Sequence, residues 1–335
     1  MQRLVALFAL AAFGVLILVS LNSRTPGGTE GARISFQIAT GASDTTLFTI
    51  GQAVAGLVSH PPGVGRCETS MVCGPSGVIL SARTSQGSFD NLTAVNSGLI
   101  DSALVQADMA AAAVKGQNPF RRVGPLRHVR VIAALFAEDV HLLVRADADV
   151  STVSDLNGKR VAVGAPGSDT AAVARDILNA FGAGRARCVS SGDPAAELAA
   201  GKLEAFFVIA GAPSPVVVAA LQGGKAKLLP LDGDAAQGLL RDNVQWQAAT
   251  IAAGAYPGSA ATPTLATRAV WIVNDRSSDA LVYGLVRALF NPANHAALAA
   301  SHPAAGEIDI ATAAQTLPAP LHSGAARYYR EAGKL

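Results

Sequence analysis

The segment best suited to binding a charged group is Val163–Thr170, VGAPGSDT, which lies between a short apolar run and a helical pattern. A strand that breaks at Gly and Pro and opens a helix with Ser, Asp and Thr presents free backbone N–H groups, which favour an anion. Asp169, however, places a carboxylate there. It is either a solvated helix cap, worth about 0.3–1 kcal/mol, or a residue that fills the anion site or meets a cationic ligand group.

Three further polar segments also follow apolar runs. They are TGASDTT at 40–46, SQGSFDN at 85–91 and VQAD at 105–108. Repeated strand–loop–helix units predict an α/β fold with parallel-rich sheets and helices on both faces. Because ligands bind such sheets outside the carboxyl ends of the strands, we expect these segments to form a binding site.

Local patterns indicate where several elements begin and end. Ile50, Val54, Leu57 and Val58 share one face of a predicted helix. Ser88 is the expected N-cap of the next helix, and Gly98 its stop. The apolar segment 129–150 predicts two strands.

Signatures of enzymes are missing from the sequence. It has no G-x-S-x-G elbow, no H-E-x-x-H motif and no Walker loop, and GVGRCE at 63–68 lacks the third Gly of a dinucleotide fingerprint. The six His residues are scattered; His141 alone is placed to face a cleft, and a structural role suits it better. We therefore expect binding without catalysis, cofactor or metal.

Composition argues against a nucleic-acid partner. Only 15% of the 335 residues are charged and the net charge is +2, while the basic segments 121–130 and 184–187 are short and interrupted. The length corresponds to about two domains.

The N-terminus predicts export. Two polar residues after the initiator Met, one of them Arg3, precede an uncharged run of 16 residues, Leu4–Val19, and a polar exit. The run is shorter than the ~20 residues of a spanning helix, so residues 1–23 are interpreted as a signal peptide, with an uncleaved membrane anchor as the alternative. Residues 24–32 form a linker.

Export also bears on the three cysteines. Cys67 and Cys73 bracket a short loop and can form a disulfide in an oxidising compartment, with two free thiols as the alternative. Cys188 has no obvious partner.

Seven segments together resemble, in order and spacing, the TAXI family of extracytoplasmic solute receptors of TRAP transporters. The segments are RISFQIATGASDTTLFTIGQAVAGLVS, TSQGSFDNL, ALVQADMA, DLNGKRVAVGAPGSDT, KLEAFFVIAGAPSP, IAAGAYPG and PLHSGAARYYREAGKL.

The resemblance implies a two-lobed type II periplasmic-binding-protein fold that closes by hinge motion. Lobe I would comprise residues 33–140 and 271–335, and lobe II residues 141–270. The implied function is capture of a small organic acid or amino acid in the periplasm and its delivery to TRAP-type permease subunits.

The resemblance also implies a set of ligand-binding residues: Thr40, Gly41, Ala42, Ser43, Thr46, Gly87, Ser88, Asn91, Gln106, Asp108, Gly167, Ser168, Asp169, Thr170, Gly211 and Tyr256. The chain departs from the family pattern at Leu47, Ala111 and Ala137, where rings or Pro are usual, and at Asp169, where Gly is usual. These departures predict either a different ligand or a membrane-tethered sensor that no longer serves transport.

Overall fold

The computed structural model describes residues 33–69 and 71–335. The predicted export segment and linker lie outside these residues. None of the helices in residues 33–69 and 71–335 combines the length and the hydrophobicity of a membrane span.

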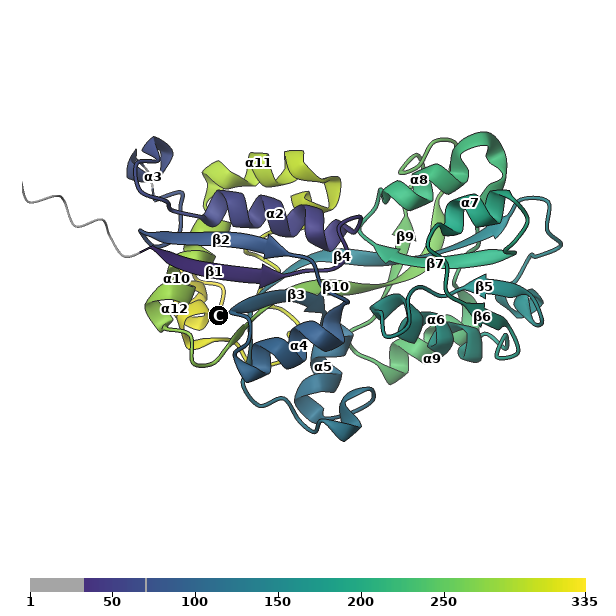
Figure 1. The fold of residues 1–335 in the computed structure, drawn as a ribbon, viewed down its shortest axis with the longest axis horizontal. Helices are drawn as coiled ribbons and strands as arrows, with labels where there is room; N and C mark the ends of the chain where they lie inside the picture. Colours follow the sequence, from purple (N-terminus) through teal and green to yellow (C-terminus); the bar gives the residue numbers. More distant parts are fainter. Residues whose placement is uncertain (1–32, 70) are drawn as a thin grey trace, which may run out of the picture.

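One mixed sheet runs through both halves of the molecule (Figure 1). Its strand order is β2-β1-β3-β10-β4-β7-β5-β6, with β8 added to β4 and β9 to β10. Two long antiparallel strands, β4 (Val129–Arg145) and β10 (Thr262–Asn274), pass from one half to the other. The halves are called lobe I and lobe II below.

The expectation of two strands in 129–150 was wrong, because β4 is a single strand of 17 residues. Its first part pairs with β10 in lobe I and its last part with β7 in lobe II. The polar pair Glu138-Asp139 looks like a turn in the sequence, but it marks the crossing between the lobes.

Lobe I contains three parallel strands with helices on both faces (Figure 1). Its strands are β1 (Ile34–Ala39), β2 (Val78–Arg83) and β3 (Ser102–Gln106), and its helices are α2 (Thr46–Val58), α3 (Gly65–Thr69), α4 (Ser88–Ser97), α5 (Ala107–Lys115), η1 (Phe120–Arg122), α10 (Asp279–Leu289), α11 (Pro292–Ser301), η4 (Pro303–Glu307) and α12 (Ser323–Glu331). Ile50, Val54 and Val58 of α2 are buried, as the helical pattern predicted.

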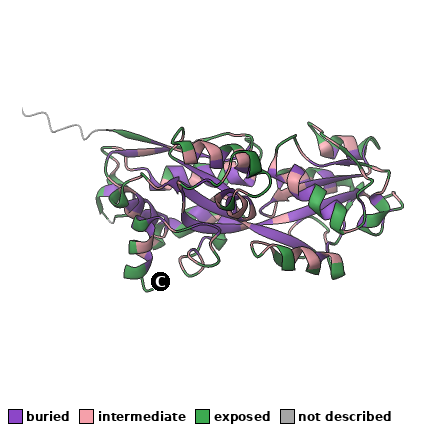
Figure 2. Ribbon diagram, turned by 90° about the horizontal axis from the view of Figure 1, so that it is seen from below, coloured by how far each residue is buried: buried purple, intermediate pink, exposed green. Residues whose placement is uncertain are grey.

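Lobe II repeats this arrangement with shorter strands. It contains η2 (Val153–Leu156), β5 (Arg160–Ala162), α6 (Asp169–Ala180), β6 (Arg187–Val189), α7 (Pro194–Ala199), β7 (Ala205–Ala210), α8 (Pro215–Leu221), η3 (Gln222–Gly224), β8 (Ala226–Leu228), α9 (Gly233–Asp242) and β9 (Gln247–Ile251). In both lobes the central strands are buried and the outer helix surfaces are exposed (Figure 2). This two-sided covering explains why central strands such as β7 are almost wholly apolar.

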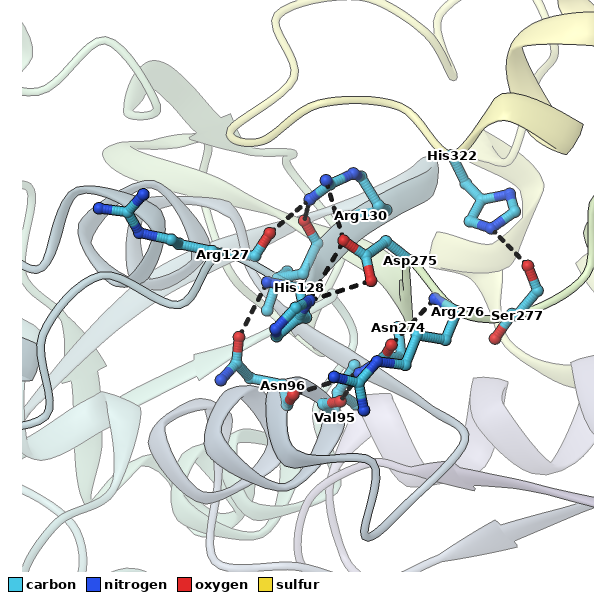
Figure 3. A network of polar contacts seen from close by, with 11 residues as sticks. Val95, Asn96, Arg127, His128, Arg130, Asn274, Asp275, Arg276, Ser277 and His322 are labelled. Carbon is cyan, nitrogen blue, oxygen red and sulfur yellow. Dashed lines mark hydrogen bonds and ion pairs between the residues drawn. The ribbon is translucent and has the colours of Figure 1, made fainter.

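A polar network fixes lobe I where β4 begins and β10 ends (Figure 3). Asp275 accepts a hydrogen bond from Arg130 Nη2 at 3.0 Å and pairs with His128 Nδ1 at 3.1 Å. Asn274 Nδ2 donates to the Val95 carbonyl at 2.7 Å, which ties β10 to the last turn of α4. Helix α4 is thereby held at its carboxyl end, with its amino end directed toward lobe II.

The ends of α4 confirm one expectation and correct another. Gly98 caps the carboxyl end in the left-handed conformation, as predicted. The N-cap is Gly87 instead of Ser88, which is the first helical residue. Gly87 has a φ of +132°, and a Cβ built there would lie 3.3 Å from Oδ2 of Asp169. A residue with a side chain would strain this backbone, and the Ser88 hydroxyl is left for another role.

The predicted disulfide joins Cys67 and Cys73, whose Cα atoms lie 5.3 Å apart. The alternative of two free thiols is therefore wrong. Both cysteines are buried in a small cluster with Val72, which anchors the loop after α2. Cys188 is a free, exposed cysteine.

Candidate functional site

The loops at the carboxyl ends of the parallel strands of the two lobes meet in an interlobe seam. On the lobe I side are the loops after β1, β2 and β3, and on the lobe II side those after β5 and β7. This edge is where α/β sheets place ligands, because several helix N-termini converge there.

Asp169 of lobe II is bonded to Ser88 of lobe I across this seam. The Ser88 backbone N–H donates to both carboxylate oxygens at 3.1 and 3.0 Å, and the Ser88 hydroxyl donates to Oδ2 at 2.7 Å. Asp169 is only 8% exposed. The solvated-cap reading of Asp169 was therefore wrong; the helix cap is Ser168, whose hydroxyl accepts from the Ala171 N–H at 3.2 Å. The Asp169 carboxylate sits at the N-terminus of α4, where a free anion would bind.

Two other carboxyl groups lie close to Asp169 and form with it an interlobe acidic cluster of Asp108, Glu138 and Asp169. Burial raises the pKa of Asp169 to about 6. The hydrogen bonds from Ser88 lower this pKa, and the charge of Asp108 raises it further. Burial, and then the charge of Asp169, raise the pKa of Glu138 to about 8. Burial also raises the pKa of Asp108, which the hydroxyl of Thr267 opposes by donating to it at 3.1 Å.

No basic side chain among the described residues forms an ion pair with this cluster. Three buried acceptor atoms also lack a hydrogen-bond donor: Oε2 of Glu138, Oε1 of Gln106 and Oδ1 of Asn91. Each of these three residues is at most 2% exposed. An unpaired buried polar atom costs about 1–3 kcal/mol, so these three acceptors each destabilise the protein in this conformation.

A second contact between the lobes involves the N-terminus of α2. The Thr46 hydroxyl donates to the Gly211 carbonyl at 3.3 Å, and His302 contacts the Pro213 carbonyl at 3.2 Å. A Cβ at position 211 would lie 2.7 Å from the Ala304 Cβ and 3.0 Å from Thr46 Cγ2. Gly211 therefore permits the close approach of the lobes.

Two cavities flank α6 where it faces lobe I. One, of about 280 Å³, lies between α6, α9 and Asp108, and is lined by Asp176, Asp242 and Trp246 together with two asparagines and three apolar side chains. We call it the Asp108–Trp246 cavity. The other, of about 460 Å³, is lined by Gly167, Ser168 and Arg175 of lobe II and by residues of α4 and α5.

The structure brings together several predicted residues and keeps others apart. Ser88 with Asp169 and Thr46 with Gly211 meet across the seam, and Asp108, Gly167 and Ser168 line cavities. Thr40 and Asn91 hold the β1 loop internally, through Asn91 Nδ2 donating to the Thr40 carbonyl at 2.7 Å. The remaining predicted residues surround these positions. Gly41, Gly87 and Thr170 are adjacent to them in the chain, the Gln106 N–H donates to the Ser88 hydroxyl at 2.9 Å, and Ala42 and Ser43 are exposed.

Tyr256 and His141 are structural residues of lobe II in this conformation. Tyr256 is fully buried, and its hydroxyl contacts His141 Nε2 at 2.7 Å and accepts from the Ser214 N–H at 3.0 Å. Burial lowers the pKa of His141 to about 4. Tyr256 lines neither seam cavity.

Sequence reasoning missed Glu138, Trp246 and Asp176 as parts of the seam. An acidic pair inside an otherwise apolar strand was the available signal for Glu138, since such a pair disrupts a buried strand unless it faces a site. No local pattern marks Trp246, which comes from the connection between α9 and β9.

Comparisons with known proteins agree with this architecture. A sequence profile of the NMT1-like family matches residues 38–333. The structure is similar to XAC2383 from Xanthomonas citri bound to chloride ion, with a TM-score of 0.52 and 11% identity over 89% of this chain and 95% of that chain. It is also similar to a binding protein component of an ABC phosphonate transporter, PA3383 from Pseudomonas aeruginosa, with a TM-score of 0.52 and 10% identity over 83% and 81%. The fold is that of type II periplasmic solute-binding proteins.

Proposed function

We propose that this protein, which belongs to the NMT1-like family, is an extracytoplasmic solute-binding protein that captures a small organic acid or amino acid between its lobes. The observation that carries the proposal is the interlobe seam, where Ser88 and Asp169, each at the start of a helix that follows a strand, bond to each other and residues of both lobes line two cavities. Binding is noncovalent, and lobe closure around the solute is the signal that a partner reads.

The lobes meet at β4 and β10, so the boundaries proposed from the sequence, 33–140 with 271–335 and 141–270, fall within these crossing strands. The two strands supply the hinge. In this closed conformation Asp169 fills the α4 N-terminus, and opening would free Ser88, Thr46 and the backbone N–H groups around them for a solute.

The partner we propose is a TRAP-type permease, which the resemblance to TAXI receptors supports. Export is supported by the sequence pattern of residues 1–23 and by the disulfide Cys67–Cys73, which is typical of proteins outside the cytoplasm. A membrane-tethered sensor on the same fold is the second candidate, favoured by the departure from the family pattern at Asp169. N-terminal sequencing of the mature protein separates the two: a cleaved signal supports the free receptor, and an intact N-terminus supports the sensor.

Calorimetric titration of ligand-stripped protein tests solute binding. The panel contains dicarboxylates, amino acids and oxo-acids, and the Gly211→Val variant serves as the comparison because its side chain blocks closure. We expect one class to bind the wild type at a 1:1 ratio and to bind the variant at least tenfold more weakly. Silence across the panel, together with protein that carries no small molecule when purified, would contradict the proposed function.

A further inference from the structure

Lobe I holds a pair of hydrogen-bond donors arranged for a carboxylate. The Ser88 hydroxyl accepts from the Gln106 N–H at 2.9 Å, which leaves the hydroxyl proton for another acceptor. The Ser88 N–H is at the start of α4, where a helix supplies no acceptor of its own. A Cβ at Gly87 would lie 3.3 Å from Oδ2 of Asp169, so glycine leaves room for the approaching group. Because Gly87, Ser88 and Gln106 all belong to lobe I, the two donors stay together when the lobes separate.

The carboxylate that these donors hold comes from lobe II of the same chain. The Ser88 N–H donates to both oxygens of Asp169 at 3.1 and 3.0 Å, and the Ser88 hydroxyl donates to Oδ2 at 2.7 Å. Helices α4 and α6 lie on the same side of the sheet, one in each lobe (Figure 1). Asp169 is the first residue of α6, so the positive amino ends of both helices face one carboxylate. Separating the lobes breaks all three hydrogen bonds.

We propose that Asp169 is an autoinhibitory latch, which closes the lobes by occupying the place of a solute carboxylate at the amino end of α4. A solute that brings a carboxylate to Ser88 binds there only after the Asp169 side chain has left. Because Asp169 is tethered by the chain, it competes at a high effective concentration. The inference rests on the proposed function, since it names the residue that competes with the solute, but closure itself is measurable without any solute.

The latch carries its negative charge at the pH of the experiment. Burial raises the pKa of Asp169 to about 6 despite the hydrogen bonds from Ser88. At pH 7.5 the group is therefore ionised, and hydrogen bonds to an ionised acceptor are stronger than those between neutral groups. The other contacts between the lobes, such as the bond from the Thr46 hydroxyl to the Gly211 carbonyl at 3.3 Å, join neutral groups. We therefore expect closure to depend chiefly on Asp169.

Asp169→Gly with added acetate tests the latch, because acetate replaces the carboxymethyl group that this substitution removes. Small-angle scattering of the solute-stripped full chain at pH 7.5 measures closure, with Gly211→Val as the reference for the open form. Hydrogen exchange of segment 85–91 measures the protection of the Ser88 N–H. Acetamide, which has a similar shape but no charge, is the control compound. Asp234→Gly, which removes an exposed acid from the first turn of α9, is the control variant.

We expect Asp169→Gly to have a larger radius of gyration than the wild type and faster exchange in segment 85–91. Acetate, but not acetamide, should restore both properties, and neither compound should change Asp234→Gly. Ser88→Ala, which removes one donor from the lobe I side, should also open the lobes, and it provides a second test if Asp169→Gly does not fold. Carboxylates of the solute panel should bind Asp169→Gly roughly tenfold more tightly than the wild type, since the tethered competitor is gone.

A folded Asp169→Gly variant that is as compact as the wild type would overturn the latch. An open variant on which acetate and acetamide act alike would also overturn it, because Asp169 would then support the lobes without occupying a carboxylate site. Weaker binding of panel carboxylates to the variant than to the wild type would overturn the competition with solute. If no member of the panel binds either protein, the proposed function fails, while scattering and acetate rescue still decide the latch.

Discussion

Replacing Asp169 with Asn should remove much of the pH dependence of stability that the seam imposes. Asp169 has a pKa of about 6 in the folded protein, against a usual value of 3.8. Because the folded pKa is the higher one, this carboxyl favours the folded state below about pH 4 and loses that contribution as the pH rises through 6. A shift of about two units corresponds to ~3 kcal/mol.

Asn at this position keeps an acceptor oxygen for the Ser88 N–H, which Asp169 now binds at 3.0 and 3.1 Å, but cannot ionise. The free energy of unfolding is measured by urea denaturation of both proteins from pH 4 to pH 8. The difference between wild type and variant should move by ~3 kcal/mol in favour of the variant as the pH rises across this range. Titrating groups outside the acidic cluster affect both proteins and cancel in the difference, whereas Glu138, whose pKa the charge of Asp169 raises, becomes easier to ionise in the variant and shifts the difference in the same direction.

Asp234→Asn is the control for removing an acid from the first turn of a helix, since Asp234 is exposed. Its stability should follow the wild-type pH profile. If the profiles of Asp169→Asn and wild type are parallel, Asp169 is not buried against Glu138 and Ser88, and the electrostatic account of the seam is refuted.

Three further substitutions test other parts of the structure. Gly211→Val should hold the lobes apart, since its Cβ would lie 2.7 Å from the Cβ of Ala304. Small-angle scattering should give this variant a larger radius of gyration than the control Gly192→Val, where a Cβ would meet no neighbouring atom within 4 Å. Equal radii would count against a close approach of the lobes at Gly211. Tyr256→Phe should lower the free energy of unfolding by about 1–3 kcal/mol, because the Ser214 N–H and His141 lose their buried partner. The control Tyr283→Phe loses an exposed hydrogen bond to Glu331 and should cost much less. Equal losses would contradict a structural role of the buried Tyr256 hydroxyl. Replacing both Cys67 and Cys73 with Ser should cost about 2 kcal/mol, as expected for so short a loop. A reducing agent should lower the stability of the wild type alone, and the same loss in the double variant would contradict a stabilising role of this disulfide.

The sequence was sufficient to predict features that depend on local patterns. The strand-to-helix transitions at Thr40, Gly87 and Gln106 were visible as apolar runs followed by Gly, Ser and Thr, and Gly98 was recognisable because a left-handed helix end favours Gly. The cysteine pair was recognisable from its spacing and the export signal.

Features that depend on the other lobe could not be predicted. Ser88 has the residue type of an N-cap, but its hydroxyl bonds to a carboxylate 81 residues away. Asp169 looked equally suited to a solvated cap because nothing near it in the chain shows that lobe I covers it. Glu138 and Trp246 belong to the seam only because β4 crosses between the lobes and the connection after α9 folds back against Asp108.

The central claim is that the two lobes hold a small solute at the seam. Native mass spectrometry of the gently purified protein, wild type beside Gly211→Val, tests it most directly. We expect a 1:1 noncovalent adduct of a small molecule on the wild type, which collisional activation releases, and much less adduct on the variant. An unliganded wild type that also fails to bind any member of the solute panel would contradict it.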